Sequence, residues 1–164
     1  MKTCVYAGSF DPITYGHLDI IQRAGEQYDR VVIAIAHNPD KKGLFTTVER
    51  YDLICMALGD AMMDITKFDV CILPPGVGLA QWAKNREASA LIRGLRAVSD
   101  FDVEFRMALA NRRLVPEIET VFFVTALEHL FVASSTAKEV ASIKGDLSTF
   151  VPPNVAEALR KRFA

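Results

Sequence analysis

The stretch Tyr6-Ala7-Gly8-Ser9-Phe10-Asp11-Pro12-Ile13-Thr14-Tyr15-Gly16-His17 decides the fold. Apolar residues 4–7 before the Gly-Ser-Asp-Pro loop predict a buried strand, and residues 18–24 after it predict a helix. In an open α/β sheet, ligands bind outside the carboxyl ends of the strands. Gly8 lets backbone approach a ligand because it has no Cβ, and the unpaired N–H groups at the start of the helix attract anions. The stretch therefore predicts phosphate binding at a sheet edge.

Composition indicates an ordinary globular protein. The chain has 164 residues, 51% of them hydrophobic, and a net charge of −1, which fits one domain over residues 1–164. This charge gives no reason to expect nucleic acid or an acidic membrane as partner, and no apolar run approaches the ~20 residues that span a bilayer. Three scattered cysteines and no signal-peptide pattern indicate a reducing cytoplasm.

Strand-like and helical segments alternate along the whole chain. Strands are expected at residues 2–7, 30–36, 67–73, 88–92 and 119–124. Right-handed crossovers between them give an α/β fold, a single-domain, doubly wound, five-stranded parallel sheet with a C-terminal helix that begins at Pro152-Pro153.

Two of the helices carry more detailed expectations. Thr47 is expected to cap the second helix, with Arg50 standing where a capping box has an acid. In the longest helix, residues 99–114, Ser99 and Asp102 approximate a capping box. Its core stripe is expected to consist of Phe101, Phe105, Ala108 and Leu109.

Cationic or anion-attracting residues recur where these strands end. They are Gly16-His17, Lys41-Lys42, Arg93 with Arg96, and the helix start at Ser134-Ser135. Such groups around Cβ-free backbone suit a polyphosphate. The chain has no Gly-x-x-x-x-Gly-Lys-Ser/Thr loop, and no Ser-His-acid set is apparent at these loops. Direct transfer at phosphorus, without a covalent intermediate, is therefore favoured.

Each of these residues also has a purely structural interpretation. A lone histidine is most often satisfied inside a fold, and loop lysines are most often solvated. The position of His17 at a helix start favours a functional role, while the sequence leaves open which of Lys41 and Lys42 faces the site. Trp82 is interpreted as a packing residue rather than a base-stacking one.

Two motifs also resemble a known family. Residues 8–12 with Thr14-Tyr15-Gly16-His17 resemble the opening of T/H-x-G-H nucleotidyltransferases. Residues 91–101 and 134–140 are similar to later motifs of the bacterial phosphopantetheine adenylyltransferases, and the likeness covers nearly the whole chain. It implies a Rossmann-like nucleotidyltransferase fold and transfer of AMP from ATP to 4′-phosphopantetheine, giving dephospho-coenzyme A and pyrophosphate. It also implies Mg²⁺, a homohexamer and inhibition by coenzyme A.

The resemblance assigns roles residue by residue. The implied catalytic residues are His17, Lys41 and Arg93. The implied ATP-binding residues are Ser9, Phe10, His17, Gly94, Arg96, Glu104, Ser134 and Ser135. The implied phosphopantetheine-binding residues are Ser9, Lys41, Leu79, Arg93 and Asn111, and no metal ligand is implied. The chain departs from the family pattern at Val103, usually aromatic, and at Ala133, usually serine.

Two other functions stay open at this point. One is a sister nucleotidyltransferase with another phosphorylated acceptor, which the block Arg93-Gly94-Leu95-Arg96 disfavours. The other is a non-catalytic nucleotide sensor on the same fold, which the presence of both His17 and Arg93 disfavours. A doubly wound domain without any site would not need four cationic segments at one edge.

Overall fold

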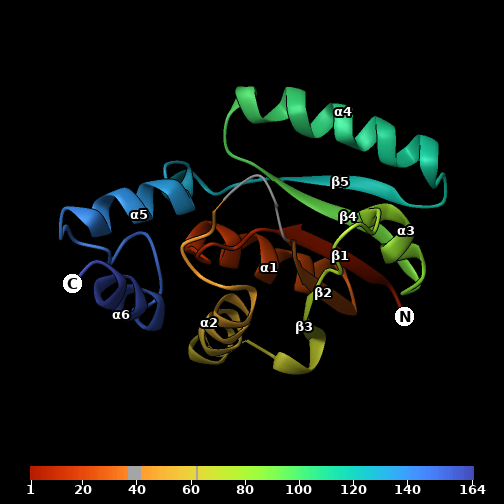
Figure 1. Cartoon of the computed structure of the whole chain (residues 1–164). Coiled ribbons are helices and arrows are strands. Elements are labelled where there is room, and N and C mark those ends of the chain that lie inside the picture. The colour runs from red at the N-terminus through yellow and green to blue at the C-terminus, as the bar shows by residue number, and fades with distance from the viewer. Residues whose placement is uncertain (37–41, 62) are drawn as a thin grey trace.

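The structure, a computed structural model, describes residues 1–36, 42–61 and 63–164 (Figure 1). Its strands are β1 (Thr3–Gly8), β2 (Arg30–Ile35), β3 (Phe68–Ile72), β4 (Ala88–Leu95) and β5 (Glu119–Val124). They form one sheet in the order β3-β2-β1-β4-β5, and all neighbouring pairs are parallel. The predicted five-stranded, doubly wound parallel sheet is confirmed, and the carboxyl ends of β1 and β4 meet at its centre.

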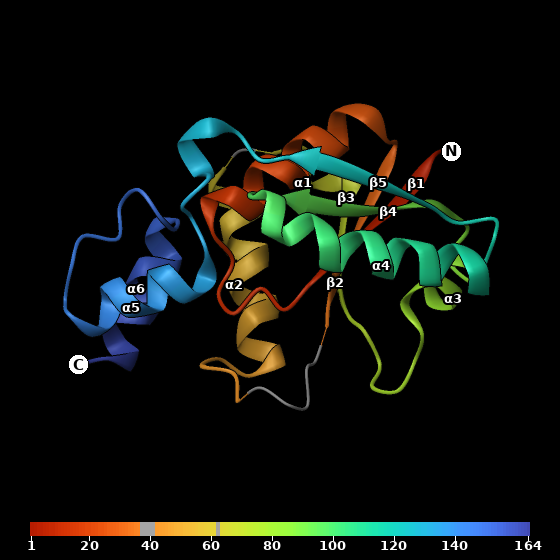
Figure 2. The same ribbon diagram turned by 90° about the horizontal axis from the view of Figure 1, so that it is seen from above.

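Helices cover both faces of this sheet (Figure 2). They are α1 (Tyr15–Gln27), α2 (Thr47–Asp60), α3 (Leu79–Lys84), α4 (Val98–Leu114), α5 (Ser134–Ser142) and α6 (Pro153–Arg162), with 3₁₀ turns η1 (Ile65–Lys67) and η2 (Leu127–His129). One core joins the sheet to α1, α2, α5 and α6, and a second core joins it to α3 and the segment that follows α4. None of the helices described here is both long and apolar enough to cross a bilayer.

The central strand shows why a continuously apolar run forms a buried strand. In β1, Cys4 and Tyr6 belong to the first core, while Val5 and Ala7 belong to the second. Successive side chains of a strand point to opposite faces, so a strand covered on both faces must be apolar at every position. The same alternation continues through β4, where Leu91 and Ile92 lie in different cores.

Two predicted boundaries are wrong. Thr46, not Thr47, caps α2: its hydroxyl accepts the Glu49 N–H at 3.2 Å, and the Glu49 carboxylate accepts the Thr46 N–H at 2.7 Å. Both threonines suit the position, and the reciprocal pair with Glu49 selects the first. Strand β4 continues to Leu95, three residues beyond the prediction, because β5 pairs with it as far as that residue.

The predicted helix over residues 99–114 is confirmed as α4, but its predicted cap and core stripe are wrong. Ala97 stands at its N-cap without a side-chain cap, so the approximate capping box does not form. Of the expected core stripe, Phe101, Phe105 and Leu109 are 40%, 44% and 53% exposed. Apolar side chains occur around much of the helix, and Val103 is exposed as well. Periodicity therefore could not identify the side that meets the sheet.

Candidate active site

A cavity of about 550 Å³ opens at the carboxyl edge of the sheet. Five residues predicted for the site line it together: Ser9, His17, Arg96, Ser134 and Ser135. The other lining residues are Asp11, Lys42, Gly43, Arg50, Ala133 and Lys138. Residues far apart in the sequence thus meet at the place where an open α/β sheet binds its ligands.

The position of His17 in the first turn of α1 fixes its tautomer. The Thr14 N–H donates to His17 Nδ1 at 3.0 Å, and the Thr14 hydroxyl lies 3.0 Å from the same nitrogen. A ring nitrogen that accepts a main-chain N–H carries no proton, so the proton of the neutral ring is on Nε2. His17 therefore presents an N–H donor.

The surroundings of His17 keep its ring neutral. Burial first, and the charge of Arg96 second, lower the pKa of the imidazole to about 4. The ring of Phe10 packs on it edge to face, with centroids 5.1 Å apart. At neutral pH the ring can donate one hydrogen bond to an anion, and it is a weak acceptor of protons.

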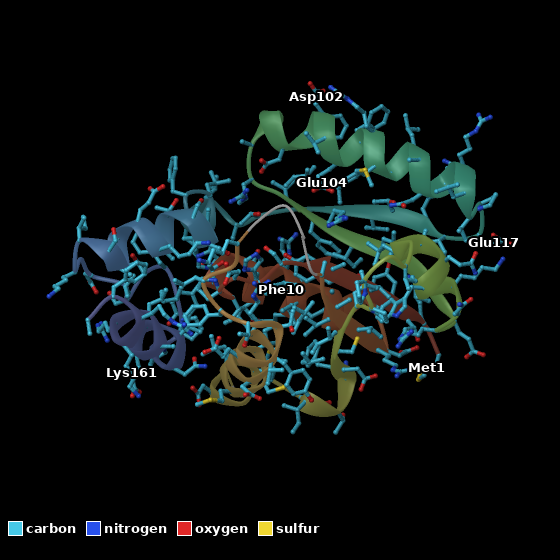
Figure 3. All side chains as sticks on the ribbon, in the orientation of Figure 1. Met1, Phe10, Asp102, Glu104, Glu117 and Lys161 are labelled. Atoms are coloured by element: carbon cyan, nitrogen blue, oxygen red, sulfur yellow. The ribbon has the colours of Figure 1, made fainter. Side chains whose placement is uncertain are left out.

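Phe10, which the resemblance assigned to ATP binding, is not among the residues that line the cavity. Its side chain is buried in the first core (Figure 3) and its φ is +45°, in the left-handed region that non-glycine residues seldom adopt. A Cβ on Gly8 would come within 3.1 Å of the Phe10 ring, so Gly8 lets this ring fold back over β1. Gly8 was expected to leave room for a ligand, and in the structure the missing Cβ also leaves room for the Phe10 ring.

Ser134 and Ser135 are the first two residues of α5, where backbone N–H groups have no partner within the helix. The Ser134 hydroxyl donates to the Pro12 carbonyl at 2.8 Å and ties this helix start to the 8–17 loop. The cavity thus receives the N-terminal ends of two helices, α1 and α5. Both ends favour negative charge.

The cationic residues expected on the rim do not all line this cavity. Lys42 and Arg96 do, whereas Lys41 lies outside the described residues. Arg93 is on the opposite face of β4 from Ile92, where its Nε lies 3.2 Å from Glu104 Oε2 of α4. Its Nη1 also donates to the Ala7 carbonyl at 3.0 Å, so Arg93 stays at the same sheet edge as the 8–17 loop.

The remaining predicted residues lie around β4. Figure 3 shows Glu104 on the side of α4 that faces the sheet; its Oε2 is buried and receives no well-aligned hydrogen bond from the described residues. Leu79 begins α3 and Asn111 is buried in α4, and these two helices pack together. Gly94 faces α1 instead, because a Cβ there would collide with Ile20 Cδ1.

Sequence reasoning missed three charged residues of the cavity. Arg50 lies near the start of α2 and Lys138 in the middle of α5, and a cation on a helix usually indicates a solvated surface. Asp11 carries the wrong sign for an anion site. Lys138 was detectable, since it follows Ser134 by about one helical turn and shares its face. Arg50 had no comparable signal. Among the described residues, no group of three or more His, Cys, Asp and Glu side chains is placed to hold a metal ion.

Solved structures with a similar fold bind nucleotides. The nicotinic acid mononucleotide adenylyltransferase of Plasmodium falciparum, complexed with NaAD, superposes with a TM-score of 0.72 over 98% of this chain and 96% of that one. The same enzyme complexed with APC superposes with a TM-score of 0.71 over 98% of this chain and 94% of that one. Their identities of 15% and 14% establish a shared fold and nothing more.

Closer relatives match in sequence. The Cytidylyltransferase-like family matches residues 5–140. A phosphopantetheine adenylyltransferase of Alkaliphilus oremlandii is 46% identical over 164 residues, covering 99% of this chain and 100% of the relative. One of Carboxydothermus hydrogenoformans is 48% identical over 165 residues, covering 99% and 97%. With the T/H-x-G-H loop at the head of an anion-attracting cavity and these end-to-end matches, the chain belongs to the phosphopantetheine adenylyltransferase family of cytidylyltransferase-like nucleotidyltransferases.

Proposed function

We propose that the protein transfers AMP from ATP to 4′-phosphopantetheine, giving dephospho-coenzyme A and pyrophosphate. The observation that carries this proposal is the full-length identity of 44–48% to relatives named for that reaction. The cavity supports it because its lining suits a polyphosphate: an N–H donor on His17, cationic side chains and two helix starts.

The reaction needs no general base from the protein. A phosphate monoester has a second pKa of about 6, so the acceptor is largely a dianion at neutral pH. One of its oxygens attacks the α-phosphorus of ATP in line, the new P–O bond forms, and the bond to the β-phosphate oxygen breaks to release pyrophosphate. The low pKa of His17 fits this scheme, because a neutral ring donates a hydrogen bond and does not take up the proton.

Charge stabilisation is then the main task of the side chains. We assign the α-phosphate to His17 and to the backbone of Ser9 and Phe10, and the β- and γ-phosphates to the start of α5 at Ser134-Ser135. Arg96 lines the same cavity and serves the nucleotide. Lys41 keeps its proposed role with the incoming phosphate; the neighbouring Lys42, which lines the cavity, is the other candidate.

The acceptor would approach from the side of β4 that carries α3 and α4. Arg93 reaches the sheet edge there through its hydrogen bond to Ala7, which suits it to the phosphate of phosphopantetheine. Leu79 and Asn111, on packed helices, are assigned to the pantetheine arm. Gly94 and Glu104, on either side of β4, are assigned to the nucleotide, and Gly94 also has a packing reason of its own.

We propose that Mg²⁺ arrives with ATP as part of the substrate. Asp11 is the one acid among the described residues of the cavity lining, and both of its oxygens already have partners, so these residues offer no donor set for a resident ion. Mg²⁺ usually keeps several waters and binds through substrate phosphates. It neutralises charge on the triphosphate when bound.

The finer features of the family are proposed as well. The apolar residues exposed on α4 support assembly into the homohexamer, because patches of this kind mark interfaces. Coenzyme A, which shares the pantetheine arm of the product, is proposed as a feedback inhibitor. A cytoplasmic location is consistent with three free cysteines.

A coupled assay of pyrophosphate release tests the function. The purified protein is incubated with ATP and Mg²⁺ and with 4′-phosphopantetheine, nicotinate mononucleotide or a sugar phosphate. We expect pyrophosphate with 4′-phosphopantetheine only, and dephospho-coenzyme A in equal amount by mass spectrometry. Turnover with another acceptor would identify a sister transferase, and ATP binding without turnover would identify a sensor; either result contradicts the proposal.

A further inference from the structure

Asp11 is a buried carboxylate in the lining of a cavity suited to anions. Its Oδ2 accepts the Leu44 N–H at 2.9 Å and lies 3.2 Å from Lys138 Nζ. Its Oδ1 accepts the Phe45 N–H at 2.9 Å and lies 3.4 Å from Arg50 Nε. One side chain thus joins the 8–17 loop, residues 44–45, α2 and α5.

Arg50 extends this connection. Its Nε donates to the Phe45 carbonyl at 2.8 Å and its Nη1 donates to the Ser9 carbonyl at 3.2 Å. A Cβ on Gly43 would collide with Arg50 Nη2, so the guanidinium fills the space beside that glycine. The guanidinium is therefore held from several sides next to Ser9, one of the predicted phosphate contacts.

Asp11 and a phosphate group both carry negative charge and repel each other, so Asp11 cannot favour phosphate binding by direct electrostatic attraction. Its two oxygens are occupied by two N–H donors and two cations, which leaves little capacity to bind Mg²⁺ or to accept a proton in a reaction. Burial acts to raise the pKa of Asp11, but the main-chain donors of Leu44 and Phe45, with Arg50 and Lys138, outweigh it and lower the pKa, so the carboxylate stays ionised at neutral pH. The remaining role for the carboxylate is to fix the groups around it.

We propose that Asp11 is a positioning residue: it holds Lys138 and Arg50 and the 44–45 turn in place so that the cavity can bind the pyrophosphate portion of its substrate. Long cationic side chains lose rotamer freedom when they bind an anion, and this loss weakens binding. A carboxylate that already holds the side chain in one conformation reduces the entropy that is lost when the anion binds. The identity of the anion rests on the proposed function, whereas the cluster itself does not.

Binding of inorganic pyrophosphate, measured by calorimetry without Mg²⁺, tests the proposal, because the two explanations predict opposite changes in affinity for Asp11→Asn. If Asp11 acted through charge alone, Asp11→Asn would bind pyrophosphate more tightly, because a negative charge has left the cavity. Positioning predicts the opposite, a loss of about tenfold, the size of one charge-assisted hydrogen bond. Equal or tighter binding by Asp11→Asn overturns the proposal.

A double-mutant cycle separates positioning from a general structural effect. Lys138→Met removes the ammonium and keeps the chain length, and Lys138 is partly exposed, so this variant is expected to fold. We expect about tenfold weaker binding from Lys138→Met as well, and a loss in the double variant with Asp11→Asn that is clearly smaller than the product of the two single losses, because Asp11 also holds Arg50 and the 44–45 turn. Losses that multiply would show that Asp11 does not act through Lys138 and would overturn the proposal.

Controls keep folding and function apart. Asp64→Asn removes a carboxylate that accepts the Thr66 N–H outside the cavity, and it should leave pyrophosphate binding unchanged. Urea unfolding of each variant shows whether it is folded at the temperature of the titration.

Steady-state kinetics test which substrate depends on Asp11. We expect Asp11→Asn to raise KM for ATP and to leave KM for 4′-phosphopantetheine within about twofold; equal rises in both would contradict positioning of the pyrophosphate subsite. Pyrophosphate binding can be measured without turnover. If the protein does not make dephospho-coenzyme A but Asp11→Asn and Lys138→Met still show coupled effects on pyrophosphate binding, the proposed function is refuted and the positioning role of Asp11 is not.

Discussion

His17→Asn tests whether this histidine works as a neutral donor. The side-chain carbonyl of the introduced asparagine can accept the Thr14 N–H in place of Nδ1, so the first turn of α1 keeps its partner. The donor at the Nε2 position is lost. We expect kcat to fall by about 10²–10³-fold, the usual cost of one preorganised donor at a developing charge. His17→Gln, whose amide can reach the Nε2 position, should retain more activity.

The depressed pKa of His17 also makes a prediction about stability. Its folded value of about 4 lies below the ordinary 6.5, so between these pH values the unfolded chain binds one more proton than the folded protein. The free energy of unfolding is therefore highest above pH 6.5 and falls as the pH is lowered towards 4. The total loss is about 3 kcal/mol, at about 1.4 kcal/mol for each pH unit.

Urea unfolding at pH 7.5 and at pH 4.5 measures this difference. The wild type should lose about 2.5 kcal/mol more than His17→Asn over this interval, because the variant has no imidazole at this position. His129→Asn, which removes a histidine outside the cavity lining, is the matched control and should behave as the wild type. An NMR titration in which the His17 resonance changes near pH 6.5 would refute the neutral-donor interpretation.

Three further predictions concern packing, capping and assembly. Gly94→Ala should destabilise the protein by about 1–3 kcal/mol in urea unfolding, and Ile20→Val, which removes the colliding methyl, should restore most of the loss; absence of rescue would contradict the packing role. Thr46→Ala should cost about 1 kcal/mol by loss of the cap, while Thr47→Ala should cost little, and the reverse order would contradict the assigned cap. Phe105→Glu should lower the oligomer mass in light scattering without changing the circular dichroism, and an unchanged mass would exclude its side of α4 from the interface.

The fold was predictable because its signals are local and repeated. Each strand is a short apolar run, and the alternation of strands with helices leaves few topologies once crossovers are right-handed. The errors arose where two neighbouring residues had equal propensity, as at Thr46 and Thr47, or where apolar side chains occur on several sides of one helix, as on α4. In both cases the choice depends on a tertiary partner.

The site was predictable in part for the same reason. Ser9, His17 and Ser134 lie in motifs that place chemistry at a strand end or a helix start, and the structure brings them to one cavity. Arg93 was expected at the same sheet edge, where its hydrogen bond to the Ala7 carbonyl keeps it, but it does not line the cavity and contacts Glu104 on the α4 side of β4. The face of β4 that carries Arg93 depends on the strand continuing past residue 92 to Leu95, which the sequence did not predict.

A carboxylate and a neutral histidine at a polyphosphate site follow from what the reaction requires. Groups that bind substrate, transition state and product equally well lower KM without raising kcat. Lys42, Arg96 and Lys138 already supply positive charge to the cavity, so a charged imidazole would add attraction for pyrophosphate after the reaction as well as before it. A fixed N–H on His17 acts over a short distance, where charge develops, and Asp11 offsets part of the cationic field while it holds the cations in place. The neutral ring of His17 thus avoids adding to the attraction that holds the product, whereas Asp11 keeps Lys138 and Arg50 in the arrangement that binds it.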